Sequence, residues 1–146
     1  MYLRILTILL CIFPGISNAM CLYEPLTKSL DSASIVFIAT LVSGEVSGPL
    51  EALKNGELYR TDYTFIVRER IKGDPSLVPK IYSTATYNDP LADVYWDASE
   101  TRLIPGDNVL VIAKGPGDVE VDFCGPSVPW NKGSEELRTY RARHAL

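Results

Sequence analysis

The stretch from Tyr63 to Asp74 is the sequence feature that most constrains the fold of this chain. Aromatic and β-branched side chains recur there at every second residue, which indicates a half-buried β-strand. Gly73, Asp74 and Pro75 then end the strand with residues typical of turns. The alternation predicts one side formed by Tyr63, Phe65, Val67, Glu69 and Ile71, and an opposite side formed by Thr64, Ile66, Arg68, Arg70 and Lys72. The apolar runs elsewhere in the chain need this strand as a partner.

Residues 1–19 have the pattern of a secretory signal peptide. Arg4 precedes an apolar run, Ile5–Phe13, and small residues at Ser17 and Ala19 form a cleavage site. The run is shorter than the ~20 residues that a membrane-spanning helix needs. We therefore expect cleavage after Ala19, a secreted or periplasmic location, no membrane span, and one domain over residues 20–146. The alternative is a short anchor that is never cleaved.

The charge balance argues against nucleic acid as a partner. The chain has 14 Lys and Arg against 18 Asp and Glu, for a net charge of −4, and it contains no basic run. Contacts to phosphates need clustered Lys and Arg side chains. Gly115-Pro116-Gly117 lacks the Lys and the helix that follow a phosphate-binding loop, so we expect a turn there and no cofactor.

Of the three cysteines, Cys11 lies in the predicted signal peptide, which leaves Cys21 and Cys124. Two cysteines in an oxidising compartment predict one disulfide bond. The alternative is a catalytic thiol, which needs a nearby base. The single histidine, His144, is two residues from the last residue of the sequence, and it cannot by itself build a zinc site or a serine triad. We therefore expect no enzyme activity and no metal site.

Five stretches are predicted as strands, and two as helices. The strands are Ser34–Ser43, Tyr59–Ile71, Val78–Thr86, Asn108–Lys114 and Val119–Cys124; the helices are Pro25–Asp31 and Ser134–His144, the second with Ser134 as its cap. A β-sandwich usually needs about seven strands. The prediction is therefore a mostly β protein, a five-stranded Greek-key barrel of the OB-fold type with a short N-terminal and a C-terminal helix.

The chain resembles bacterial relatives of the tissue inhibitors of metalloproteinases (TIMP-like proteins), within the netrin-like (NTR) superfamily of OB-folds. Four segments carry the resemblance in order: Cys21, Ala33–Ser43, Tyr63–Asp74, and Pro105–Ala113 followed by Cys124–Pro129. The resemblance implies an OB-fold that binds a protein and a structural disulfide between Cys21 and Cys124. It also implies an alternative function, inhibition of a metalloendopeptidase whose zinc is chelated by the mature N-terminus.

The sequence departs from the animal inhibitors at that terminus. Those proteins begin with Cys-x-Cys, and a further disulfide holds the first Cys on the zinc. Here Ala19 stands at that first position, no cysteine lies between Cys21 and Cys124, and cleavage after Ala19 leaves Met20 at the terminus. We therefore expect a protein-binding module first, with the metalloprotease inhibitor as the alternative.

Two segments are candidates for contact with a protein partner. The first, implied by the resemblance, is the N-terminal edge, formed by Met20, Cys21, Leu22 and Tyr23. The alternative is that this segment binds nothing and is simply a terminus held in place by Cys21. The second contains Tyr87, Tyr95 and Trp96, which either anchor a partner or cover one end of the barrel. Four acidic residues lie close to them in the sequence: Asp89, Asp93, Asp97 and Glu100. We expect these residues to form a solvated loop; the alternatives are a calcium site or, last, the active site of an enzyme.

Overall fold

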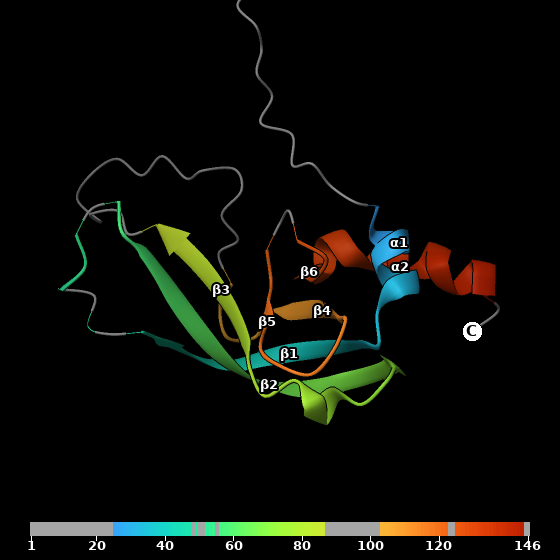
Figure 1. Cartoon of the computed structure of the whole chain (residues 1–146), viewed down its shortest axis with the longest axis horizontal. Helices are drawn as coiled ribbons and strands as arrows, with labels where there is room; N and C mark the ends of the chain where they lie inside the picture. Colours follow the sequence, from blue (N-terminus) through green and yellow to red (C-terminus); the bar gives the residue numbers. More distant parts are fainter. Residues whose placement is uncertain are drawn as a thin grey trace, which may run out of the picture.

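The structure is a computed structural model that describes residues 25–47, 49, 52–54, 56–86, 103–122 and 125–144. Strands dominate it, as predicted (Figure 1). The elements are α1 (Leu26–Ser32), β1 (Ile35–Val46), β2 (Leu58–Lys72), a 3-10 helix η2 (Pro75–Leu77), β3 (Ile81–Thr86), β4 (Asn108–Ala113), β5 (Val119–Glu120), β6 (Val128–Pro129) and α2 (Trp130–His144).

The strands form one curled sheet in the order β5-β3-β2-β1-β4-β6 (Figure 1). β3 and β5 run parallel, and the other neighbouring strands are antiparallel. The sheet curls into a half-barrel, which confirms the predicted mostly β, barrel-like fold. The described chain has six strands rather than five, because Val128 and Pro129, predicted to follow the sheet, pair with Leu110 and Val109.

The sheet is covered on both faces, and β1 supplies side chains to both. Phe37, Ala39 and Leu41 lie in an inner cluster enclosed by the curl, while Val36 and Ile38 lie in an outer cluster beneath the helices. Burial on both faces explains why this strand is a continuous apolar run rather than an alternating one. The first half of β1 is almost entirely buried, as is β4 beyond Asn108.

The faces of β2 differ from the simple alternation. Tyr63 and Phe65 pack into the inner cluster, as predicted, but Ile71 packs into the outer cluster with the helices. The cause is a β-bulge: the β1 register passes over Arg68, which lies between Tyr63 and Ile71. An extra residue reverses the side to which the following side chains point. The prediction that Ile71 shares a face with Tyr63 was therefore wrong.

Helix α2 starts at Trp130, so the predicted start at Ser134 and the predicted cap there were wrong. Trp130, Gly133, Leu137 and Tyr140 recur at the spacing of one helical face, which lies on the outer cluster. A Cβ added to Gly133 would lie 2.9 Å from Leu110 Cδ2, so glycine allows the helix to approach the sheet closely. The pattern is hidden in the sequence because glycine takes the place of an apolar residue.

Two other boundaries moved for local reasons. The third strand was predicted to begin at Val78 and begins at Ile81. The residues before it, Pro75–Leu77, form η2, and the Asp74 carboxylate accepts a hydrogen bond from the Ser76 amide at the start of η2. Of the predicted fifth strand, β5 keeps only Val119 and Glu120, and Val121 makes an isolated bridge to Ser127. The first helix lies where it was predicted, with Leu26 and Leu30 both buried.

Candidate functional site

The side chains that the sequence singles out lie outside the described residues. They are Met20, Cys21, Leu22, Tyr23, Tyr87, Asp89, Asp93, Tyr95, Trp96, Asp97, Glu100 and Cys124. The predicted disulfide and both partner-binding segments therefore stay predictions. The structure does describe the residues that hold the ends of the segment 87–102.

Tyr63 connects Leu103, the first described residue after that segment, to β2 and β3. Its hydroxyl donates to the carbonyl of Leu103 over 2.9 Å and lies 3.3 Å from the Ser83 hydroxyl of β3. Tyr63 and Ser83 are each 5% exposed, so these bonds form in the interior, where an unpaired hydroxyl is costly. Gly44 of β1 makes room for the ring, because a Cβ there would lie 2.8 Å from Tyr63 Cε1. The chain thus returns from the segment 87–102 beside Ser83 of β3.

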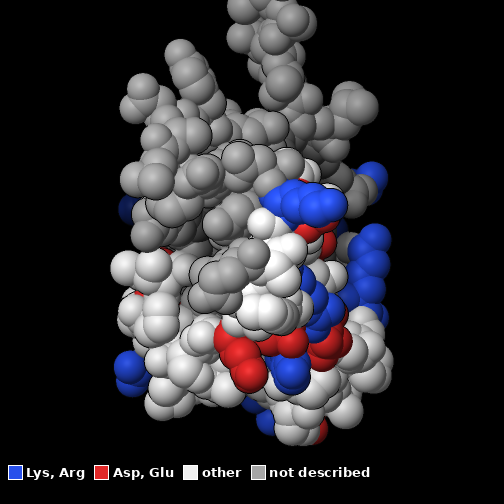
Figure 2. Space-filling view, turned by 90° about the vertical axis from the view of Figure 1, so that its left-hand side faces the viewer, with Lys and Arg blue, Asp and Glu red and all other residues white. Residues whose placement is uncertain are grey.

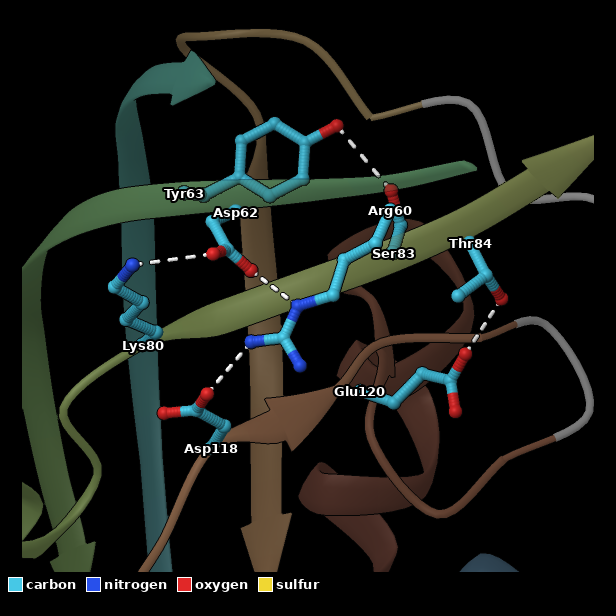
Figure 3. A network of polar contacts seen from close by, with 8 residues as sticks. All are labelled: Arg60, Asp62, Tyr63, Lys80, Ser83, Thr84, Asp118 and Glu120. Carbon is cyan, nitrogen blue, oxygen red and sulfur yellow. Dashed lines mark hydrogen bonds and ion pairs between the residues drawn. The ribbon is translucent and has the colours of Figure 1, made fainter. Parts of the chain in front are cut away.

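The opposite side of β2 carries a group of charged residues that the sequence analysis did not identify (Figure 3). We call Arg60, Asp62, Lys80 and Asp118 the ion-pair cluster. Arg60 donates from Nε to the Asp62 carboxylate and from Nη2 to Asp118 Oδ2 at 2.6 Å. Lys80 Nζ lies 3.1 Å from the second oxygen of Asp62. The cluster therefore joins β2 to the residues that precede β3 and β5.

The strand register explains why these side chains meet. Asp62 lies opposite Tyr82 in β3, which in turn lies opposite Glu120 in β5. The Arg60 guanidinium stacks over the Tyr82 ring at 3.8 Å from its centroid, in a cation–π contact. Beside it, Thr84 donates to Glu120 Oε1 at 2.6 Å. Figure 2 shows charged side chains of both signs gathered in one band of this side of the molecule, beside uncharged surface.

The ion-pair cluster favours the charged forms of Asp62 and Arg60. The hydrogen bond from Arg60, followed by that from Lys80, holds the pKa of Asp62 below its usual value despite partial desolvation. The hydrogen bonds that Arg60 donates, first to Asp62 and then to Asp118, raise the pKa of Arg60. A general acid or base works best with a pKa near the working pH, and these shifts lead away from it. The arrangement therefore suits a structural connection between strands.

We expect the ion-pair cluster to make stability depend on acidity. Because the pKa of Asp62 is lower in the folded chain, its contribution is complete above the ordinary aspartate pKa and is lost as the pH falls through the lowered value. Asp62→Asn should lower the Tm at neutral pH by roughly 2–5 °C. Thermal melts of both proteins should converge in acid and in high salt, and an equal difference at every pH would contradict the assignment.

Neither a metal centre nor a membrane helix is found in the part of the chain that the structure describes. No three His, Cys, Asp or Glu side chains are grouped there in a way that would hold a metal ion. None of the described helices has the length and apolar character needed to cross a membrane. Comparison with known proteins found no family model that matches the chain and no curated protein with significant similarity to it.

Proposed function

We propose that this chain is an exported, disulfide-stabilised, protein-binding module without catalytic activity of its own. Its partner would be held by the N-terminal edge, Met20–Tyr23, and by the segment that contains Tyr95 and Trp96. The barrel-like fold supports the proposal, because barrels of this type commonly bind through loops carried on a rigid scaffold. The location in the periplasm or outside the cell rests on the signal-peptide pattern.

The observation that carries the proposal is the double hydrogen bond of Tyr63. It joins Ser83, three residues before the end of β3, to Leu103, the first described residue after the segment that contains Tyr95 and Trp96. Holding one end of a connection against the strand that leads into its other end lowers the entropy that its residues lose when a partner binds. Large aromatic side chains are also those that most often carry binding energy in protein interfaces.

The ion-pair cluster supports binding over catalysis. Its carboxylates already accept from Arg60 and Lys80, and the pKa of Asp62 is shifted away from the range of a proton-transfer group. The cluster instead connects β2 to the residues that precede β3 and β5, and so stiffens β3, the strand whose far end leads into the segment 87–102. A stiff support is what a binding loop needs.

The predicted disulfide between Cys21 and Cys124 would hold the N-terminal edge. On one side of Cys21 the chain enters α1, whose Leu26 and Leu30 are fully buried. On either side of Cys124 in the sequence, the Gly125 amide donates to the carbonyl of Asp122, and the Asp122 amide donates to that of Ser127. Both cysteines thus adjoin segments that are packed on the barrel.

The function is tested with the exported protein, first by its intact mass before and after reduction and alkylation. We expect a mass that begins at Met20, with both cysteines protected from alkylation until reduction. The protein is then used to capture partners from the exported fraction of its host, in parallel with Tyr95→Ala/Trp96→Ala and a control, Tyr59→Ala. A partner retained by the control and lost by the double variant supports the proposal.

Three results would overturn it. Equal capture of the partner by the original chain and by both variants would show that the aromatic segment does not contribute to binding. A terminus at Cys21 together with inhibition of a zinc metalloproteinase, abolished by one extra N-terminal residue, would establish the inhibitor instead. Activity that survives Cys21→Ser and fails in Asp93→Asn/Asp97→Asn would establish an enzyme.

A further inference from the structure

Part of the outer face of the sheet continues beyond the two helices. In β1, Val36 and Ile38 lie under the helices, and Thr40 follows them on the same face, opposite Asn108 of β4 and Ile66 of β2. Farther along, Ser43 lies opposite Thr64, and Glu45 opposite Asp62. Figure 1 shows both helices at one end of the sheet, with β1 and β2 extending away from them. We call this uncovered part the outer strip: Thr40, Val42, Ser43, Glu45, Thr64, Ile66, Arg68 and Asn108.

The centre of the outer strip is apolar. Ile66 is 54% exposed, and Val42, which occupies a β-bulge after the buried Leu41, is 50% exposed. Large aliphatic side chains at neighbouring positions of a sheet leave an apolar surface that gains free energy when it is covered.

The polar groups of the outer strip are already bonded to one another. The hydroxyls of Ser43 and Thr64 are 2.6 Å apart, and Thr40 Oγ1 donates to Asn108 Oδ1 at 2.5 Å. Arg68 Nε donates to Thr40 Oγ1 at 2.8 Å. Covering a polar group is costly mainly when the group loses its partner. These pairs keep their partners under a covering molecule, so this surface can be covered at low cost.

The charges of the outer strip lie at its two ends. Arg68 is at the end near the helices, and Glu45 is at the end near the β1–β2 connection, with the apolar side chains between them. Neither forms an ion pair with another residue that the structure describes. When a second copy is laid antiparallel on this face, Arg68 of each chain meets Glu45 of the other. The pattern is therefore self-complementary about a twofold axis.

We propose that the chain forms a twofold-symmetric dimer in which the outer strips of two copies pack face to face. Stacked sheets lie about 10 Å apart, close to the thickness of a helix layer, so the second sheet fits into the layer that α2 occupies beside the strip. The Ile66 and Val42 side chains of the two copies form the apolar centre, and two Arg68–Glu45 pairs close its ends. Dimerisation does not depend on the proposed function, because it uses neither the N-terminal edge nor the segment 87–102.

The first test measures the mass of the exported protein in solution by analytical ultracentrifugation over a wide concentration range. We expect a concentration-dependent dimer. Ile66→Asp places two carboxylates in the apolar centre and should weaken the dimer roughly a hundredfold. Leu77→Asp changes an aliphatic side chain of similar exposure, 45%, in η2 and should leave the dimer unchanged. A monomer at every concentration, or a dimer that tolerates Ile66→Asp, would overturn the proposal.

The second test exchanges the charges. Arg68→Glu and Glu45→Arg each bring like charges together and should each weaken the dimer roughly tenfold. The double variant restores opposite charges and should recover the affinity of the original chain. A purely local role of Arg68 through its bond to Thr40 predicts no such recovery, and thermal melts of the monomers show whether each variant folds. If the double variant dimerises no more tightly than the weaker of the two single variants, this arrangement is ruled out.

Discussion

Replacing Gly73 by alanine is expected to cost roughly 3–5 kcal/mol of the free energy of unfolding. Gly73 ends β2 with a φ of +68°, a conformation that side chains with a Cβ rarely adopt. A Cβ at this position would lie 2.1 Å from the carbonyl oxygen of Ser34 and 3.0 Å from Ile35 Cα. These are backbone atoms at the start of the buried half of β1, so no side chain can rotate away to relieve the clash.

Gly56→Ala is the matched control for this prediction. Gly56 also has a positive φ, +86°, but no atom lies within 4 Å of the Cβ that alanine would add. Its substitution should therefore cost only the backbone strain, about 1 kcal/mol. Urea denaturation of the three proteins measures the difference directly. Equal losses at the two glycines would show that the contact with Ser34 has no energetic weight.

Phe37→Ala is expected to remove about 3–5 kcal/mol, a large fraction of the roughly 5–15 kcal/mol that stabilises an ordinary domain. Phe37 is 0% exposed and lies in the middle of the inner cluster, opposite Val111 of β4. Its ring stacks on that of Phe65, with 5.6 Å between the centroids. Truncation would leave a cavity enclosed by the curl of the sheet, where β1 is held on both sides and cannot move in to fill it.

Phe65→Ala removes the other ring of the same stack and serves as the comparison. Phe65 is only partly buried and packs against the inner cluster from its edge, so its loss should be clearly smaller. The midpoints of denaturant unfolding, at unchanged slope, would give both values. A loss at Phe65 equal to or larger than that at Phe37 would mean that the inner cluster is centred elsewhere than the structure places it.

The two proposals assign different surfaces to different partners. Protein binding would use the N-terminal edge and the segment 87–102, whereas dimerisation would use the outer strip of β1 and β2. A dimer would place two partner-binding segments on one particle, and two weak sites that act together bind more tightly than either alone. Ile66→Asp is expected to separate these effects, because it should produce a monomer that still captures the partner with lower avidity.

Much of the secondary structure follows from local patterns in the sequence. The alternation from Tyr63 places β2, the apolar run from Ile35 places β1, and Gly73 marks where β2 ends. These signals are readable because a strand exposes its two faces in turn, and because few residues accept a positive φ. The same signals support the mostly β, barrel-like fold.

Which residues meet was decided by the tertiary structure. The bulge at Arg68 moved Ile71 to the face opposite Tyr63, since a bulge depends on how the neighbouring strand pairs rather than on the bulged residue alone. Helix α2 begins at Trp130 because Gly133 fits against Leu110, a contact between distant parts of the chain. Arg60 reaches Asp118, 58 residues away, only because β5 lies parallel to β3. The sequence by itself thus determined the strands and turns, while non-local pairing assembled the ion-pair cluster and the outer strip.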